Sequence, residues 1–189
     1  YSNGIQGLTS NRVKKLLHEL GKHSTMYLEI GSAMGSTAVS VLDTGIPVTC
    51  IDNWKQNVNP EGGAFELPDN SKDQFDNNTK QYDNLTVYNN DMLDVKLDKK
   101  YDLFFYDGPH DKVQTINAVK HYSKYWKDES ILVFDDANWQ GVVQGAVEGI
   151  QQTDFTIEIE RMILNNVEDA TKWWNGLYAV VVKKNDKHI

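Results

Sequence analysis

Acidic side chains in this sequence follow directly on short apolar runs, which is where the strands of a parallel sheet would end. Asp52, Asp107 and the pair Asp135-Asp136 each close such a run. The carboxyl ends of parallel strands meet at one edge of a sheet, and open α/β sheets bind their ligands at that edge. We therefore expect these carboxylates to gather there and to form a polar site.

A glycine-rich turn precedes them. Residues 29–37 read Glu-Ile-Gly-Ser-Ala-Met-Gly-Ser-Thr, the pattern of a strand end, a turn and a helix start. Gly31 and Gly35 lack a Cβ atom, so the backbone can turn sharply and approach a ligand. A dinucleotide fingerprint would have glycines at 31, 33 and 36, where this chain has Gly31, Ala33 and Ser36. On its own, the segment is also compatible with a plain strand-to-helix turn.

Asp52 indicates a nucleoside ligand, because a carboxylate at the end of a second strand can accept both hydroxyls of a ribose. Nicotinamide cofactors use the same arrangement, so Asp52 does not decide which nucleoside is bound, and a simple turn aspartate is the alternative. After the third strand, Asn90, Asp91 and Met92 are candidates for contacts with an adenine ring. Asn and Asp are also ordinary turn residues, so this second assignment is weaker.

Strands and helices alternate along the chain, which predicts an α/β fold with a doubly wound parallel sheet. Residues 55–71 are rich in Gly, Pro, Asn and Asp, and we expect a long loop or a lid there. The spacing of apolar residues predicts helices over 10–22, 35–42, 72–82, 111–125 and 141–151, strands over 26–30, 47–51, 85–88, 101–106 and 131–134, and a closing β pair over 155–164 and 177–182.

Length and charge narrow the class of protein. The 189 residues fit one domain, 1–189, and their net charge of −8 argues against nucleic-acid and anionic-membrane partners. No apolar run approaches the roughly 20 residues that cross a bilayer. The single cysteine, Cys50, lies in an apolar run and is interpreted as a core residue. A cytoplasmic location is expected.

The four motifs, taken in order, resemble the class I S-adenosylmethionine-dependent methyltransferases. The likeness is to the small-molecule branch that includes sugar O-methyltransferases, similar to methyltransferase family 24. It implies a Rossmann-like seven-stranded sheet, mostly parallel with an antiparallel last strand. It also implies that S-adenosylmethionine is held by Glu29, Gly31, Ser32, Gly35, Asp52, Asn53, Trp54, Asp91, Met92 and Asp107.

In metal-dependent relatives, aspartates at the positions of Asp107, Asp135 and Asp136 bind a divalent cation, so the resemblance implies a Mg²⁺ site. Neighbouring carboxylates repel one another unless a cation lies between them, and hard oxygen ligands suit Mg²⁺. The alternative is that one of the pair only caps the following turn.

The chain departs from the pattern of these relatives at Pro109, where they often carry a second aspartate proposed as the base. Asp107 and the adjacent His110 are then the candidate catalytic residues, because an unperturbed imidazole titrates near pH 6.5. His110 can equally be a residue that only hydrogen-bonds in its loop. Loss of catalytic activity also stays open.

We expect the protein to methylate a hydroxyl of a sugar or another small polar acceptor. An NAD-dependent oxidoreductase and a catalytically inactive S-adenosylmethionine-binding domain are the alternatives. The acceptor is not named by the sequence. Candidates for the walls of its pocket are Trp54, Trp139, Trp173 and Trp174, with core or rim packing as the alternative for each. The oligomeric state is open, and a homodimer is compatible with the helix over 10–22.

Overall fold

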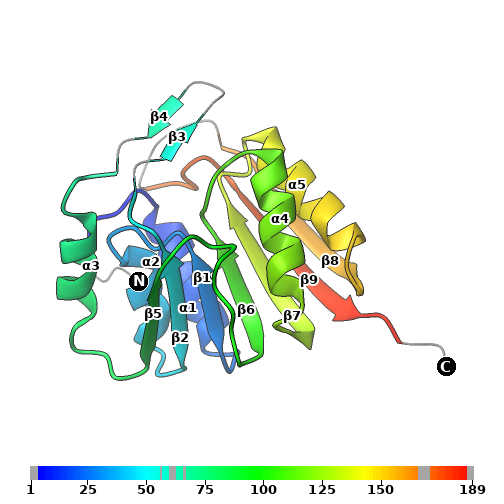
Figure 1. The fold of residues 1–189 in the computed structure, drawn as a ribbon, viewed down its shortest axis with the longest axis horizontal. Helices are drawn as coiled ribbons and strands as arrows, with labels where there is room; N and C mark the ends of the chain where they lie inside the picture. Colours follow the sequence, from blue (N-terminus) through cyan, green and yellow to red (C-terminus); the bar gives the residue numbers. More distant parts are fainter. Residues whose placement is uncertain (1–3, 56, 60–62, 66, 166–170, 187–189) are drawn as a thin grey trace.

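The computed structural model of the protein describes residues 4–55, 57–59, 63–65, 67–165 and 171–186. Its centre is one seven-stranded sheet in the order β5-β2-β1-β6-β7-β9-β8 (Figure 1). The strands are β1 (Tyr27–Ile30), β2 (Val48–Asp52), β5 (Leu85–Asn89), β6 (Tyr101–Tyr106), β7 (Trp126–Asp135), β8 (Phe155–Ile163) and β9 (Leu177–Lys184).

The direction of the strands is that of the predicted fold. Neighbouring strands from β5 to β7 pair in parallel. The last strand, β9, lies between β7 and β8 and is antiparallel to both. The predicted Rossmann-like sheet with an antiparallel last strand is therefore confirmed.

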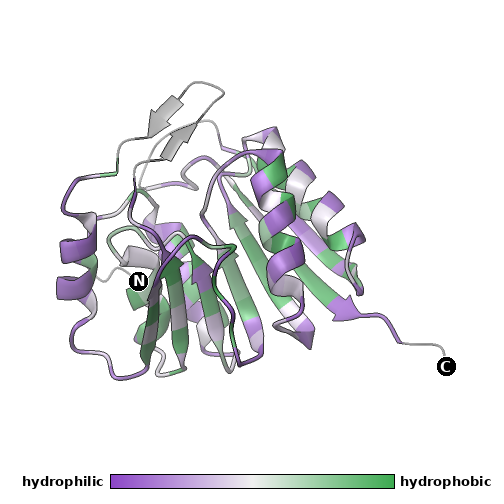
Figure 2. Ribbon diagram, in the orientation of Figure 1, coloured by the Kyte–Doolittle hydropathy of each residue, from purple (hydrophilic) through white to green (hydrophobic). Residues whose placement is uncertain are grey.

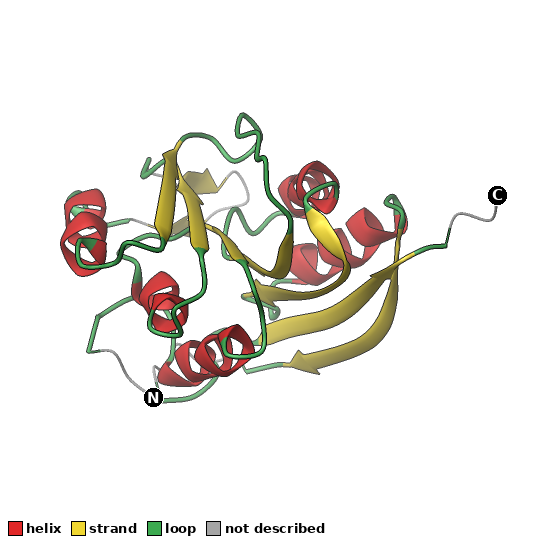
Figure 3. Cartoon of the chain, turned by 90° about the horizontal axis from the view of Figure 1, so that it is seen from below, coloured by secondary structure: helices red, strands yellow, loops and turns green. Residues whose placement is uncertain are grey.

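Helices cover both faces of the sheet (Figure 3). One core cluster joins the sheet to α1 (Asn11–Gly21), α2 (Ser36–Leu42) and α3 (Ser71–Thr79), and a second joins it to α4 (Lys112–Ser123) and α5 (Gln140–Gln151). Residues 103–106 of β6 are large and mostly apolar because they serve both clusters: Leu103 and Phe105 face the first, and Phe104 and Tyr106 face the second. Figure 2 accordingly shows hydrophobic strands in the centre of the sheet and hydrophilic residues on the helices.

Local signals account for where the helices begin. The Ser10 hydroxyl accepts a hydrogen bond from the Val13 N–H and caps α1, and the Asp111 carboxylate accepts one from the Gln114 N–H and caps α4. Among the described residues, no helix is long and apolar enough to cross a membrane.

One predicted boundary, the start of the strand over 131–134, was wrong. Strand β7 begins at Trp126 and not at Ile131, because Trp126 is buried in the core and pairs with Tyr101 of β6. The polar residues 127–130 between Trp126 and Ile131 gave no strand pattern in the sequence. Within the predicted loop 55–71, β3 (Asn57–Asn59) and β4 (Gly63–Phe65) pair as an antiparallel hairpin. Residues 56, 60–62 and 66 of that loop lie outside the described part.

A polar network fastens the amino-terminal edge of the sheet, away from the predicted ligand site. The Asp102 carboxylate accepts hydrogen bonds from the backbone N–H groups of Thr25 and Met26, and Lys127 lies 3.0 Å from it. These contacts lower the pKa of Asp102, although its burial acts in the opposite direction. We therefore expect the hydrogen bonds of Asp102 to contribute to the free energy of unfolding and not to ligand binding.

Candidate functional site

The predicted site residues lie at the carboxyl ends of the parallel strands, near the point where the strand order reverses on either side of β1. Strand β1 pairs with β2 on one side and with β6 on the other. The crevice outside such a switch point is the usual binding site of this class of sheet. Two hydrogen bonds fix the backbone there, from Gly31 N–H to the Ile51 carbonyl and from Asp107 N–H to the Ile30 carbonyl, both 2.9 Å long.

The two glycines of the turn are required by protein contacts. Gly31 has φ +83°, and a Cβ atom there would lie 2.0 Å from the Asp107 carbonyl oxygen. Gly35 has φ +82°, and its Cβ would lie 3.0 Å from the ring of Phe75. The expected close approach of the turn to a ligand is thus, in this structure, a close approach to other parts of the chain.

Ala33, between the glycines, joins the turn to the end of β2. Its N–H donates to the Asp52 carboxylate at 2.8 Å, and its carbonyl accepts from the Trp54 indole N–H at 2.8 Å. Both Ala33 and Trp54 have positive φ, 43° and 47°. The Trp54 ring also packs edge-on against Phe75, with the ring centroids 5.1 Å apart. No sequence pattern pointed to Ala33 or Phe75.

The Asp52 carboxylate has the hydrogen-bond acceptors that two ribose hydroxyls need. Its two oxygens each accept one backbone N–H, from Ala33 at 2.8 Å and from Trp54 at 2.7 Å. Each carboxylate oxygen can accept a second hydrogen bond, so two hydroxyls can still be bound. The next residue, Asn53, uses its side-chain oxygen for the Lys55 N–H.

Glu29 lies under the turn with its side chain fully buried. Its Oε2 accepts a 2.5 Å hydrogen bond from the Tyr27 hydroxyl, whereas Oε1 has no hydrogen-bond partner among the described residues. Burial raises the pKa of Glu29 to about 7. The Ser32 hydroxyl, also buried, lacks a hydrogen-bond partner in the same described part.

The end of the third parallel strand adjoins Asp52. Asn89, the last residue of β5, is the register partner of Asp52. Asp91 is exposed and accepts the Leu93 N–H on its carboxylate at 3.0 Å. The Met92 carbonyl accepts a hydrogen bond from the Tyr122 hydroxyl, and its side chain packs against the core. These two candidates therefore lie at the correct edge, next to β2.

On the other side of the switch point, three side chains form a charged cluster, which we call the Asp107 cluster. His110 Nε2 lies 2.8 Å from Asp136 Oδ2 and 3.8 Å from Asp107 Oδ1. One ligand atom from each of Asp107, His110 and Asp136 can be chosen so that all lie within 4.8 Å of one another. The sequence analysis expected all three residues at this edge of the sheet, and the structure places them there. It did not predict that His110 would lie close to both carboxylates.

The charges of the cluster depend on one another. Burial opposes a charged imidazole, but Asp107 and Asp136 outweigh it and raise the pKa of His110 to about 10. Burial also raises the pKa of Asp107, and the neighbouring His110 opposes that rise. His110 is therefore protonated at neutral pH in this arrangement and acts as the counter-charge of the two carboxylates.

Asp135, the third predicted metal ligand, lies outside the cluster. Its side chain is buried, and its Oδ1 accepts the Asp136 N–H at 3.1 Å. Burial, followed by the charges of Asp107 and Asp136, raises its pKa well above the usual value. This places Asp135 behind Asp136, which itself has the positive φ of 56° that turns its side chain toward His110.

The loop after β7 also carries a half-exposed indole. Trp139 lies edge-on against His110, with ring centroids 4.5 Å apart, and is 36% exposed. The preceding Asn138 fixes this loop to the connection between β8 and β9, donating its N–H to the Asn175 carbonyl and accepting the Asn165 N–H on its side chain. The indole thus lies beside the Asp107 cluster, in a loop that Asn138 joins to the connection between β8 and β9.

A comparison of the sequence with family models identifies the family of this chain. A family model described as a methyltransferase domain matches residues 28–137, which contain the glycine turn, Asp52 and the Asp107 cluster. The chain belongs to this methyltransferase family, and the predicted enzyme class is confirmed. The comparison with curated proteins returned no match.

Solved structures share the fold at low sequence identity. An O-methyltransferase from Bacillus cereus in complex with SAH is 15% identical with a TM-score of 0.65, over 91% of this chain and 81% of that one. TomG from Streptomyces achromogenes, an O-methyltransferase of tomaymycin synthesis in complex with SAM, is 17% identical with a TM-score of 0.65 over 92% and 81%. The N-methyltransferase NodS from Bradyrhizobium japonicum is 16% identical with a TM-score of 0.62 over 92% and 86%. The fold is thus shared by O- and N-methyltransferases.

Proposed function

We propose that the protein transfers a methyl group from S-adenosylmethionine to a hydroxyl oxygen of a sugar or another small polar acceptor. One observation carries the proposal: the Asp52 carboxylate, already bound to the glycine turn, lies across the switch point from the Asp107 cluster. A nucleoside-binding carboxylate and a proton-handling cluster are the two parts that such a transfer needs. Neighbours of the same fold bind SAM or SAH, and two of them are described as O-methyltransferases.

The residues present fit this cofactor. The free lone pairs of Asp52 suit two ribose hydroxyls, and the carboxylate is held in position by Ala33 and Trp54. Glu29 is a positioning residue in this proposal, because its buried carboxyl supports the turn from below. Asp91 and Met92 are suitable for the adenine side, next to the end of β2. When bound, S-adenosylmethionine supplies an electrophilic methyl group on a sulfonium.

In the transfer, the bond between sulfur and the methyl carbon breaks, a bond between the methyl carbon and the acceptor oxygen forms, and the oxygen loses its proton. The Asp107 cluster is suited to take up that proton or to stabilise the oxygen as the proton leaves. His110 accepts a proton only after losing the one it holds against Asp136. Trp139, whose ring lies edge-on against His110, is a candidate to contact the acceptor and to orient it beside the cluster.

The cluster also fits a divalent cation. Ligands on opposite sides of an ion lie about 4 Å apart for Mg²⁺ and about 5 Å apart for Ca²⁺, and the three ligand atoms here lie within 4.8 Å. Asp107 and Asp136 would hold the ion, and His110 would join them only as a neutral imidazole, so that ion binding would release its proton. Asp135 accepts the Asp136 N–H and so supports that residue. When bound, a cation there would supply Lewis-acid chemistry, because it would lower the pKa of an acceptor hydroxyl bound to it.

The experiment separates the two halves of the site. Asp52→Asn should weaken S-adenosylhomocysteine binding in calorimetry by about tenfold or more, because it removes a charged hydrogen-bond acceptor. Asp136→Asn should leave that affinity within about threefold while lowering methyl transfer to a panel of sugar and phenol acceptors by about 100-fold. Asp98→Asn, at an exposed position, is the matched control. Full cofactor affinity in Asp52→Asn, or full turnover in Asp136→Asn, would contradict the respective role.

A further inference from the structure

The turn that follows β7 carries two of the side chains that surround His110. Asp136 begins the turn and Trp139 ends it, and the Trp139 N–H donates a 2.9 Å hydrogen bond to the Asp136 carbonyl. Asp136 Oδ2 lies 2.8 Å from His110 Nε2, and the Trp139 ring lies edge-on against the imidazole with centroids 4.5 Å apart. The conformation of this one turn therefore sets two contacts of His110.

The turn needs support from outside to keep this conformation. Asp136 has φ 56°, in a region that non-glycine residues seldom adopt and that persists where the surrounding structure enforces it. Trp139 is partly exposed, so packing alone fixes its ring incompletely. Contacts with another part of the chain are therefore required to hold the two ends of the turn.

Asn138, in the middle of the turn, makes those contacts. Its Oδ1 accepts the Asn165 N–H at 3.0 Å, and its Nδ2 donates to the carbonyl of the same residue. Its backbone N–H donates to the Asn175 carbonyl at 2.9 Å. A primary amide carries a donor and an acceptor in one plane, so it can pair with both backbone groups of Asn165 as a neighbouring antiparallel strand would. Gly176 leaves room for this amide, because a Cβ atom there would lie 2.9 Å from Asn138 Oδ1.

The β8–β9 connection that receives these hydrogen bonds is itself anchored. Trp173 packs against the core cluster on the α1 side of the sheet. Its carbonyl accepts hydrogen bonds from the Asn165 side chain at 2.7 Å and from the Gly176 N–H at 3.1 Å. Arg12 of α1 donates a 3.1 Å hydrogen bond to the Thr171 carbonyl. The described parts of the connection are thus tied both to the core and to α1.

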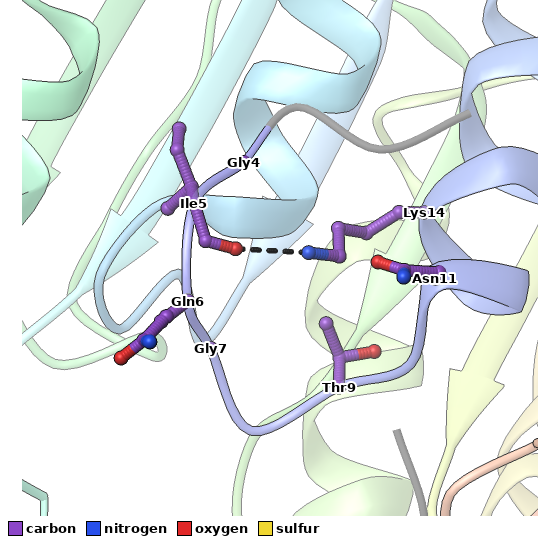
Figure 4. Close-up of a pocket in the computed structure, with 7 residues that line it drawn as sticks. All are labelled: Gly4, Ile5, Gln6, Gly7, Thr9, Asn11 and Lys14. Atoms are coloured by element: carbon purple, nitrogen blue, oxygen red, sulfur yellow. Dashed lines mark hydrogen bonds between the residues drawn. The ribbon is translucent and has the colours of Figure 1, made fainter. Parts of the chain in front are cut away.

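The end of α1 that bears Arg12 is held in its turn by the segment before the helix. The buried Lys14 extends its Nζ to the Ile5 carbonyl, to which it donates a 2.9 Å hydrogen bond (Figure 4). The Ser10 hydroxyl caps the same turn of the helix. Asn138 is therefore bonded to a support that is fixed at several points.

We propose that Asn138 is a positioning residue for methyl transfer. Its amide and backbone N–H fix the turn to the β8–β9 connection, and the turn in its place holds Asp136 and Trp139 against His110. Because its amide is used by Asn165, Asn138 acts through the turn and not on the acceptor. The inference rests on the proposed function, since it concerns the same cluster.

The test compares Asn138→Ala with Asn84→Ala. Asn84 is the matched control, because its amide also donates to backbone carbonyls, those of Leu42 at 3.3 Å and Ile46 at 2.7 Å, but at the amino-terminal edge of the sheet. Both variants should lower the midpoint of thermal unfolding, because each loses the hydrogen bonds of a partly buried amide. Asn138→Ser, compared with Asn84→Ser, keeps the test decisive if Asn138→Ala does not fold.

The first readout needs no acceptor. The ring signals of the five histidines are followed in a ¹H–¹³C spectrum of the ligand-free protein with EDTA present, and His110→Gln identifies the signal of His110. Asn138→Ala should shift that signal, and Asn84→Ala should leave it in place. An unmoved His110 signal in Asn138→Ala, or the same shift in both variants, would overturn the proposal.

The second readout is methyl transfer to an acceptor that the wild type uses. Asn138→Ala should lower kcat about 10- to 100-fold, because a small displacement of the groups around the reacting atoms is enough for such a loss. The affinity for S-adenosylhomocysteine should stay within about threefold, and Asn84→Ala should keep both quantities within about threefold. An unchanged kcat in Asn138→Ala, or an equal loss in Asn84→Ala, would contradict the positioning role. A shifted His110 signal in a protein that transfers no methyl group would count against the proposed function alone, because the support of His110 by Asn138 would stand.

Discussion

Gly31 and Gly45 offer a direct measurement of how tightly the glycine turn is packed. Their φ values are nearly equal, +83° and +85°, so replacement by alanine imposes the same backbone strain at both positions. They differ in their surroundings: an added Cβ lies 2.0 Å from the Asp107 carbonyl oxygen at Gly31 and meets nothing within 4 Å at Gly45. The comparison therefore isolates the contact between the turn and the Asp107 loop.

The strain alone should cost about 1–2 kcal/mol in Gly45→Ala. In Gly31→Ala the clash is with backbone, so the turn or the Asp107 loop must move and disturb the two hydrogen bonds that fix them, from Gly31 to Ile51 and from Asp107 to Ile30. At about 1 kcal/mol for each hydrogen bond, the additional loss is about 2 kcal/mol. Gly31→Ala should therefore be destabilised about twice as much as Gly45→Ala.

Urea unfolding at pH 7 measures both free energies, and a lower midpoint at unchanged slope reports the loss of stability. Calorimetry with S-adenosylhomocysteine provides a second readout, because movement of the turn should weaken binding in Gly31→Ala and leave it unchanged in Gly45→Ala. Equal free energies of unfolding in the two variants would refute the close packing of the turn against Asp107.

Two further predictions concern pH. Burial raises the pKa of Glu29 to about 7, so the unfolded chain loses this proton at a lower pH than the folded protein, and the free energy of unfolding should fall by about 3 kcal/mol between about pH 4.5 and pH 7. In urea titrations of the ligand-free protein, Glu29→Gln should remove most of this fall. A pH dependence that is the same in Glu29→Gln and the wild type would argue against a buried protonated carboxyl. Asp102 has the opposite behaviour, because its lowered pKa stabilises the fold above its unfolded pKa, near pH 4, and that contribution is lost as the pH falls through the folded value. Asp102→Asn should cost about 2 kcal/mol at pH 7 and progressively less below about pH 4, measured by thermal unfolding; a loss independent of pH would contradict the charged network with Lys127.

The strand ends were predictable because they depend on burial. Runs such as 103–106 and 131–134 are apolar since a central parallel strand faces a core on both sides, and an acidic residue follows each run directly. The start of β7 was not predictable, because Lys127, Asp128 and Glu129 continue the strand after the buried Trp126 with no apolar pattern.

The site was predictable in its position but less so in its contacts. Asp107 and Asp136 were expected together, but the third member of their cluster is His110, while Asp135 lies buried behind them. Which of two adjacent aspartates turns toward the cluster depends on the positive φ of Asp136, and no residue type signals that conformation here. The roles of Ala33 and Asn138 arise from backbone and tertiary contacts with distant segments, which one sequence does not encode locally.

The most direct test of the account is thermal unfolding with S-adenosylmethionine, S-adenosylhomocysteine and NAD, each with and without Mg²⁺. A ligand at 100 times its dissociation constant stabilises the folded state by about 2.7 kcal/mol, which gives a clear shift of the midpoint. We predict that S-adenosylmethionine and S-adenosylhomocysteine raise the unfolding midpoint and that NAD does not, with a further rise of the midpoint when Mg²⁺ is added. Stabilisation by NAD alone, or by none of the three, would contradict the assignment of Asp52 and the glycine turn to S-adenosylmethionine.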